Sequence, residues 1–266
     1  MPESTTDLLV LKLEPPLAWM VINRPAAHNA LNSEVWKGIA ETAQRLARDE
    51  SVRVIILRGA GEKAFISGAD ISEFSTLRQN AEMTARYDQL SAAAWLALHS
   101  APQPVIAMIN GLCYGGGVSV ALACDLRFAS EHSRFAVPAT RLGLSYPMAG
   151  GVEKLVQTVG PTHAAHILLS AQPIDAQEAL RIGLVNRVVA GDELEETTRT
   201  YALRMAEGAP FTLAAHKMAI QESLRAASER NHEALREAMR RCFDSDDYQE
   251  GIAAFLEKRP PRFRGS

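Results

Sequence analysis

The sequence predicts an α/β protein in which helices cover a largely parallel β-sheet, followed by a C-terminal helical layer. Short apolar runs typical of buried strands alternate with segments of helical spacing over roughly the first 195 of the 266 residues. The remaining pattern is wholly helical. We therefore expect an α/β core at 1–195 and a helical region at 196–266. Such a helical layer needs a surface to pack on, and contact with another subunit would supply one.

The N-terminal segments predict a hairpin, a capped helix and a buried strand. LLVLKLE (8–14) and LAWMVIN (17–23) are short β-rich runs that a Pro-Pro turn joins. After them, Asn32 or Ser33 can cap a helix whose apolar residues recur at helical spacing. VRVIILRG (52–59) then fits a buried strand that ends at a glycine. The alternation of strand and helix begins here.

The middle of the chain continues this alternation. SGADISEF (67–74) starts a helix with Asp70 as its expected N-cap. PVIAMING (104–111) fits a buried strand, and GGVSVALACD (116–125) fits the helix that follows it. Two more strands and three C-terminal helical segments complete the prediction, at 126–130, 134–138, 193–208, 211–227 and 232–259.

Composition and charge exclude several classes of function. The chain has 28 Lys and Arg against 31 Asp and Glu, so it offers no basic surface for nucleic acid or an anionic membrane. Cys113, Cys124 and Cys242 lack metal-ligand spacing, and free thiols in a reducing cytosol are the simplest interpretation. No signal peptide and no run of transmembrane length is present. We expect a cytoplasmic protein without a bound metal; a targeting sequence trimmed from the N-terminus is the alternative.

Two glycine turns, AFISGAD (64–70) and INGLCYGGGVS (109–119), each lead from a strand into a helix. Backbone N–H groups at a helix start have no intrahelical acceptor, and the helix dipole favours negative charge there. If the turns lie side by side, one N–H from each can hold a single oxygen in an oxyanion hole. The alternative is that both are merely tight connections. Neither turn fits a P-loop or a dinucleotide fingerprint, so we expect no nucleotide cofactor.

Several motifs resemble, in order and spacing, those of the crotonase family, the enoyl-CoA hydratase/isomerase superfamily. The resemblance extends from about residue 8 to 263. It rests on INRPAAHNAL (22–31), AFISGADISEF (64–74), PVIAMINGLCYGGG (104–117), ACDLRFAS (123–130), QEALRIGLVNRVV (177–189) and AFLEKRPPRF (254–263).

The resemblance implies a spiral of ββα turns, usually a trimer or a dimer of trimers, that binds acyl-coenzyme A thioesters. Coenzyme A then enters as part of the substrate, and no separate cofactor is expected. By motif position, the backbone N–H groups of Ala69 and Gly116 hold the thioester oxygen and stabilise an enolate. Glycines suit this role because a β-carbon would collide with the approaching thioester. The implied substrate-binding residues are Ala26, Ala27, Ala64, Ser67, Gly68, Asp70, Ile71, Tyr114, Gly115 and, from the C-terminal helix, Lys258.

The chain departs from the family at the two glutamates that hydratases use to position water and move protons. Ser119 stands where the first would be, and Ala139, in VPATRLG, stands where the second would be. Neither residue can act as a general acid–base group near pH 7. We therefore do not expect ordinary enoyl-CoA hydration. Ala139 also disfavours isomerisation, because isomerases of the family often keep the second carboxylate.

Other residues are candidates for moving protons. Tyr146, in RLGLSYPMAGGVEKL (141–155), could point into the pocket or be a core or interface tyrosine. Tyr87 and Asp88 lie in the variable helix that shapes the acyl pocket in this family. His99 could be a base, although a position at a helix end is the plainer interpretation.

Two charged residues near Tyr146 complete the candidates. Arg141 could hold a carboxylated acyl group or form a surface ion pair. Glu153 is expected to begin a helix and face solvent.

Three functions remain open from the sequence. The first is an acyl-CoA enzyme of the superfamily, of lyase or isomerase type, whose reaction is unassigned. The second is a non-catalytic acyl-CoA binder that retains the pocket. The third is a CoA-thioester hydrolase, because GVSVA approaches the G-x-S-x-G motif with Ser119 as the nucleophile and His132, His163 or His166 as the base. Ser119 could also merely fill the space of the missing glutamate.

Overall fold

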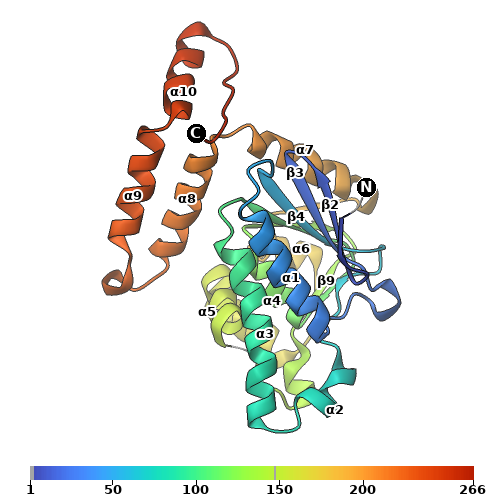
Figure 1. Cartoon of the computed structure of the whole chain (residues 1–266). Helices are drawn as coiled ribbons and strands as arrows, with labels where there is room; N and C mark the ends of the chain where they lie inside the picture. Colours follow the sequence, from blue (N-terminus) through green and yellow to red (C-terminus); the bar gives the residue numbers. More distant parts are fainter. Residues whose placement is uncertain (1–2, 147) are drawn as a thin grey trace.

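The computed structural model describes residues 3–146 and 148–266 and shows an α/β core from which a helical arm projects (Figure 1). Within these residues, the main sheet has the strand order β1-β2-β3-β4-β6-β8-β11, and a smaller sheet has the order β10-β9-β7-β5. The main-sheet strands are β1 Glu3–Thr6, β2 Leu9–Glu14, β3 Leu17–Ile22, β4 Val54–Gly59, β6 Val105–Ile109, β8 Leu126–Ser130 and β11 Arg187–Val189. The others are β5 Ala64–Ile66, β7 Leu112–Tyr114, β9 Arg134–Ala136 and β10 Ile174–Asp175.

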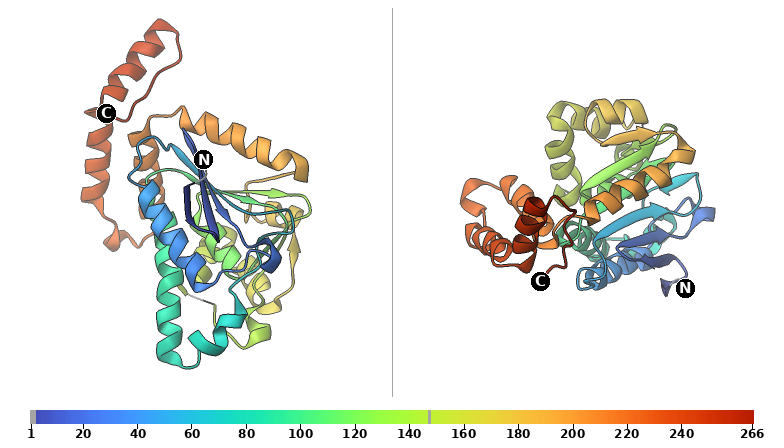
Figure 2. Two further views of the ribbon diagram at one scale, coloured as in Figure 1. Left: turned by 45° about the vertical axis from the view of Figure 1, so that its right-hand side comes forward. Right: turned by 90° about the horizontal axis from the view of Figure 1, so that it is seen from above.

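Helices cover both faces of the main sheet, and the last three form the arm (Figures 1 and 2). α1 and α3 pack side by side on one face, whereas α7 crosses the other. In the described residues the α-helices are α1 Ser33–Leu46, α2 Phe74–Leu77, α3 Ala81–Ser100, α4 Gly116–Ala123, α5 Glu153–Ser170, α6 Ala176–Arg181, α7 Leu194–Ala206, α8 Pro210–Ser223, α9 His232–Phe243 and α10 Asp246–Glu257.

Burial on both faces explains why the main strands are unbroken apolar runs in the sequence. Successive side chains of a strand point to opposite faces. Ala18 and Ile55 accordingly join the larger apolar cluster, which includes α1, α3 and α4, while Trp19 and Ile56 join a second cluster with α7. β3, β4, β6, β8 and β11 run parallel, whereas β1, β2 and β3 are antiparallel. The predicted largely parallel sheet with its N-terminal hairpin is confirmed.

Each short strand of the smaller sheet follows a strand of the main sheet. β5 follows β4, β7 follows β6 and β9 follows β8, and helical segments come after each pair. The chain thus repeats strand, strand and helix. The sequence analysis identified β9 but missed β5 and β7, because each has only three residues and merges with a glycine turn. These two strands decide where the glycine turns lie.

The predicted helix starts at Asn32 and Asp70 are correct, but the helix that follows Asp70 is shorter than predicted. Asn32 caps α1, since its side chain accepts a hydrogen bond from the backbone at 2.9 Å. Asp70 does act as an N-cap, but it caps a 3₁₀ helix, Ile71–Glu73, that continues only into the short α2. The long helix α3 begins later, because Asn80 provides a new cap. Two caps close together thus divide what the sequence suggested as one helix.

The C-terminal region is helical, as predicted, but the single segment predicted at 232–259 is two helices, because the Ser245 hydroxyl caps α10 by accepting from the Tyr248 N–H at 3.2 Å. α8 fastens the arm to the core through the Lys217 ammonium, which lies 2.8 Å from Asp125 and 3.1 Å from the carbonyl oxygen of Gln103. α9 and α10 lie farther out (Figure 2). The division at residue 195 and the subunit contact stay predictions. None of the helices in the described part combines the length and apolarity needed to cross a membrane.

Candidate active site

The two glycine turns adjoin at the carboxyl ends of β5 and β7. These strands pair in parallel, with Ala64 opposite Leu112. Leu31 fixes the first turn, because its N–H donates to the Gly68 carbonyl at 2.8 Å and its carbonyl accepts from the Asp70 N–H at 2.9 Å. A β-carbon built on Gly116 would lie 3.6 Å from the Ala69 nitrogen. Ala69 and the start of α4 are therefore neighbours.

The backbone N–H groups of Ala69 and Gly116 are free among the described residues. Their neighbours are engaged: the Gly115 N–H donates to the Ala136 carbonyl at 2.8 Å, and the Ser67 N–H donates to the His28 carbonyl at 3.1 Å. Gly116 begins α4, so its N–H has no intrahelical acceptor. Since buried backbone donors are nearly always paired, two adjacent free donors at a cavity indicate a place for an external acceptor.

Each of the three glycines of the second turn suits its position for a different physical reason. Gly115 has a φ of 50°, which favours glycine. A β-carbon on Gly117 would lie 2.5 Å from the Ile66 carbonyl oxygen, so only glycine lets α4 approach β5. A β-carbon on Gly116 would lie 3.4 Å from Trp36, where the cavity begins.

A cavity of about 160 Å³ adjoins both turns. Its wall includes residues from β5–α2, from the start of α4, from α3 and from the 3₁₀ helix Pro138–Leu142. Eleven residues singled out from the sequence line it: Ser67, Gly68, Ala69, Ile71, Tyr87, Asp88, Gly115, Gly116, Ser119, Ala139 and Tyr146. Segments far apart in the sequence thus form one site.

Other residues predicted to bind substrate lie beside the cavity or away from it. Asp70 is paired with Arg24 at 2.8 Å and also accepts from Ser72; these two partners, Ser72 foremost, lower the pKa of Asp70. The segment with Ala26 and Ala27 adjoins this turn, because the Ala27 carbonyl oxygen lies 3.5 Å from the Ser67 hydroxyl. The described cavity lining does not include Ala26, Ala27, Ala64, Asp70 or Tyr114.

Lys258 lies far from the cavity in this chain. It is exposed, has a φ of 55° and ends α10, the outermost helix of the arm (Figure 1). The cavity lies on the other side of the core, toward α2. The chain by itself therefore does not bring Lys258 to the cavity, because α8 directs the arm away from it.

Three neutral residues from α4 and from the segment 139–146 also line the cavity. The Ser119 hydroxyl, on α4, donates to the Gly150 carbonyl at 3.1 Å, and the Tyr146 hydroxyl donates to the Gly115 carbonyl at 2.9 Å. Ala139 adds only a methyl group. Burial raises the pKa of Tyr146 against the opposing effect of the Ser119 hydroxyl. Tyr146 is thus a protonated donor at neutral pH.

The α3 candidates also line the cavity, and both have partners. The Tyr87 hydroxyl accepts from the Trp36 indole N–H at 3.1 Å and lies 3.3 Å from the Leu31 carbonyl oxygen, to which it donates. Burial raises the pKa of Tyr87. Asp88 forms an ion pair with Arg78. Among the described residues that line the cavity, Asp88 is the one carboxylate.

The remaining candidates lie outside the cavity lining. His99 ends α3 as expected and stacks on Trp95 with ring centroids 4.4 Å apart. Burial, assisted by the charge of Lys154, lowers the pKa of His99 to about 4. Glu153 is exposed at the start of α5, and Arg141 is exposed without an ion pair to the described residues.

A hydrolase triad is not assembled around Ser119. No histidine of the described chain lines the cavity. His132 lies elsewhere, where a β-carbon on Gly191 would be 2.8 Å from its ring. His163 and His166 are on α5. The search for groups of three metal-ligating side chains, restricted to the described residues, finds none.

Sequence reasoning missed Trp36 and Arg78, both of which line the cavity. Trp36 is one of the apolar residues that recur at helical spacing in the predicted helix after Asn32, and its ring is buried against Gly116 and Tyr87. Arg78 follows α2 in a segment without apolar periodicity. No pattern in the sequence distinguishes it from a surface arginine.

Comparison with known proteins agrees with this geometry. The family described as Enoyl-CoA hydratase/isomerase matches residues 14–266. The short-chain-enoyl-CoA hydratase of Clostridium acetobutylicum is 38% identical over 251 residues, which cover 94% of this chain and 95% of that protein. The crotonyl-CoA hydratase of Syntrophomonas wolfei is 36% identical over 256 residues, which cover 96% and 97%.

A solved structure gives the same result for the fold. The crystal structure of an enoyl-CoA hydratase/carnithine racemase from Magnetospirillum magneticum superimposes with a TM-score of 0.94 at 39% identity, covering 98% of this chain and 97% of that one. The crotonase-like fold inferred from the motifs is thereby confirmed. The chain belongs to the enoyl-CoA hydratase/isomerase family of enzymes.

Proposed function

We propose that this protein binds an acyl-CoA thioester and stabilises its enolate with the backbone N–H groups of Ala69 and Gly116. The observation that carries the proposal is that these two donors are free, adjacent and at the cavity. A thioester oxygen between them would gain charge in the transition state, where such donors act most strongly. The dipole of α4 adds to this effect. The names of the two relatives, a short-chain-enoyl-CoA hydratase and a crotonyl-CoA hydratase, support a thioester substrate.

We propose further that ordinary hydration is not the reaction. Ser119 and Ala139 provide no carboxylate, and Asp88 is already paired with Arg78. Tyr146 is the protonated group nearest the turn, since its hydroxyl bonds to Gly115, and it can supply a proton to the enolate carbon. Among the described residues of the lining the one carboxylate, Asp88, is paired with Arg78, so water accepts the α-proton and returns a proton to Tyr146.

Exchange of the α-protons of butyryl-CoA in D₂O, followed by NMR, tests enolate stabilisation directly. We expect exchange above the rate in buffer and hydration of crotonyl-CoA far below that of the Clostridium acetobutylicum relative. Exchange at the buffer rate would contradict the proposal. Hydration at the relative's rate would contradict the significance of the missing glutamates.

The non-catalytic binder remains the second candidate, and the lack of a proton acceptor favours it. Such a protein would be stabilised by butyryl-CoA, by about 2.7 kcal/mol at a concentration 100 times its Kd, without accelerating exchange. Thermal unfolding and exchange, measured on the same sample, distinguish the two.

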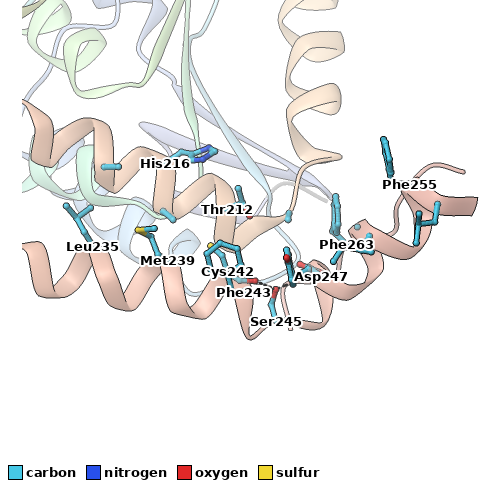
Figure 3. A pocket seen from close by; sticks show the side chains of 17 residues that line it. Thr212, His216, Leu235, Met239, Cys242, Phe243, Ser245, Asp247, Phe255 and Phe263 are labelled. Atoms are coloured by element: carbon cyan, nitrogen blue, oxygen red, sulfur yellow. Dashed lines mark hydrogen bonds between the residues drawn. The ribbon is translucent and has the colours of Figure 1, made fainter. Parts of the chain in front are cut away.

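We propose that a second copy of the chain covers the arm, as the resemblance to trimeric proteins implies. An apolar groove of about 750 Å³ lies between α8, α9 and α10 (Figure 3). Phe243 is 57% exposed and Phe255 is 82% exposed, far more than isolated apolar residues require. Light scattering should give a molecular mass in solution that is a multiple of the 28.9 kDa of one chain. Phe255→Ser should reduce it, whereas Leu169→Ser, at an apolar residue 76% exposed on α5, should not.

A further inference from the structure

One end of the cavity is polar, although most of its lining is apolar. Arg78, which follows α2, and Asp88 and Ser91 of α3 line this end. The Ser91 hydroxyl donates to the Asp88 carbonyl at 2.9 Å, and the Asp88 carboxylate forms an ion pair with Arg78. Arg78 is therefore the residue that can offer a further hydrogen bond here.

A row of contacts separates Arg78 from the proposed oxyanion donors. A β-carbon on Gly116 would lie 3.4 Å from Trp36, and the Trp36 indole bonds to the Tyr87 hydroxyl at 3.1 Å. The Tyr87 ring centroid is 5.0 Å from the Arg78 guanidinium carbon. Two aromatic side chains thus lie between Gly116 and Arg78. A thioester held at Gly116 would bring the far part of its acyl chain, several carbons away, to the guanidinium.

The Arg78 guanidinium is held in place but not fully satisfied. One of its terminal nitrogens pairs with Asp88, and its carbon lies 4.8 Å from the Phe74 ring centroid and 5.0 Å from that of Tyr87. Its side chain is only 16% exposed. Its Nε is enclosed by protein, so a ligand in the cavity can reach only the terminal nitrogens. One of these pairs with Asp88, and the other, which has no hydrogen-bond partner among the described residues, can donate to a ligand acceptor.

We infer that Arg78 recognises a neutral oxygen, a hydroxyl or carbonyl, on the acyl chain several carbons from the thioester. This inference rests on the proposed acyl-CoA function and specifies its substrate class. The charge of Arg78 is already balanced by Asp88, so a neutral acceptor leaves this end of the cavity neutral. A carboxylate would place a second negative charge beside Asp88, and like charges at such short range disfavour each other. Unsubstituted acyl chains would leave the second terminal nitrogen without an acceptor.

Calorimetric affinities for three ligands test the inference: hexanoyl-CoA, 6-hydroxyhexanoyl-CoA and adipyl-CoA, with the matching four- and eight-carbon series. For at least one chain length, the hydroxy ester should bind about 10-fold more tightly than the plain ester, the value of one good hydrogen bond to a charged group. The dicarboxylic ester should bind no more tightly than the plain one. Arg78→Met should abolish the preference for the hydroxy ester.

Two further variants keep the test decisive. Arg86→Met is the matched control, since Arg86 lies on α3 near Asp88, is 75% exposed and pairs with Glu82 outside the cavity lining, and it should retain the preference. Asp88→Asn leaves Arg78 in place but removes its counter-charge. It should therefore shift the preference toward adipyl-CoA, even if Arg78→Met fails to fold.

Three outcomes would overturn the inference: equal binding of plain and hydroxy esters at every length, preference for the dicarboxylic ester in the unaltered protein, or a preference that survives Arg78→Met. Tight binding of hexanoyl-CoA together with any of these leaves the proposed acyl-CoA function intact. If no CoA ester binds, the proposed function fails as well.

Discussion

The two walls of the cavity are held in different ways. The wall with the proposed oxyanion donors consists of backbone, positioned by the pairing of β5 with β7 and by the two hydrogen bonds of Leu31. Asn29 adds support, since its side-chain amide donates to the carbonyls of Ala60 at 3.0 Å and Ala64 at 2.7 Å. The rest of the lining presents side chains, among them Ser119, Ala139 and Tyr146, and is called the side-chain wall below. A substitution in the side-chain wall changes the chemical groups that face the cavity. The backbone wall accepts a substitution only where a β-carbon fits without displacing the N–H donors.

Restoring carboxylates to the side-chain wall should have the largest effect. The double variant Ser119→Glu/Ala139→Glu places carboxylates at the two positions where the resemblance implies the acidic groups of a hydratase. Because general acid–base catalysis contributes about 10²–10⁴-fold, hydration of crotonyl-CoA should rise by about that factor. The loss of absorbance of the enoyl thioester measures it. Arg141→Glu, on the same 3₁₀ helix but outside the lining, controls for added negative charge and should leave hydration unchanged.

The backbone wall should break at Gly117. In Gly117→Ala the new β-carbon would lie 2.5 Å from the Ile66 carbonyl oxygen, so α4 must move away from β5. We expect a loss of about 1–3 kcal/mol in the free energy of unfolding and, as the Gly116 donor is displaced, about 10²–10³-fold slower α-proton exchange. Gly251→Ala on α10, where the nearest atom is 3.6 Å away, should change neither. Unchanged exchange in Gly117→Ala would argue against donors fixed by this turn.

Tyr146→Phe should have an intermediate effect that separates catalysis from packing. The variant loses a hydroxyl that donates to Gly115 at 2.9 Å. As a proton donor, Tyr146 would contribute about 10²-fold to kcat with little change in KM. A purely structural Tyr146 would instead cost about 1 kcal/mol of stability and move both constants together. Kinetics of exchange at several butyryl-CoA concentrations, with thermal unfolding beside them, decide between these outcomes.

The same contrast explains what the sequence could predict. The turns of Ala69 and Gly116 were visible because glycine clusters at strand ends report on backbone geometry directly. The cavity end at Arg78 was not visible, because its position depends on how α2 and α3 divide between Asp70 and Asn80. Lys258 was assigned to the substrate from its motif alone. The direction of its arm depends on the contacts of Lys217 with Asp125 and Gln103, which no local pattern encodes.

The smallest effect concerns His99, which lies behind α4 and outside the cavity lining. Its pKa is lowered to about 4, first by burial and then by Lys154, against about 6.5 in the unfolded chain. Between these values the unfolded state binds more protons than the folded state, so stability falls as the pH drops from about 6.5 to about 4. Because His99 is partly exposed, we expect a loss on the order of 1 kcal/mol. Urea unfolding at pH 7.0 and 5.0 should show it, and His99→Gln should reduce the slope.

Affinity for butyryl-CoA should stay constant over the same range, because no histidine of the described chain lines the cavity. An affinity that follows the titration of His99 would instead connect this residue to the side-chain wall.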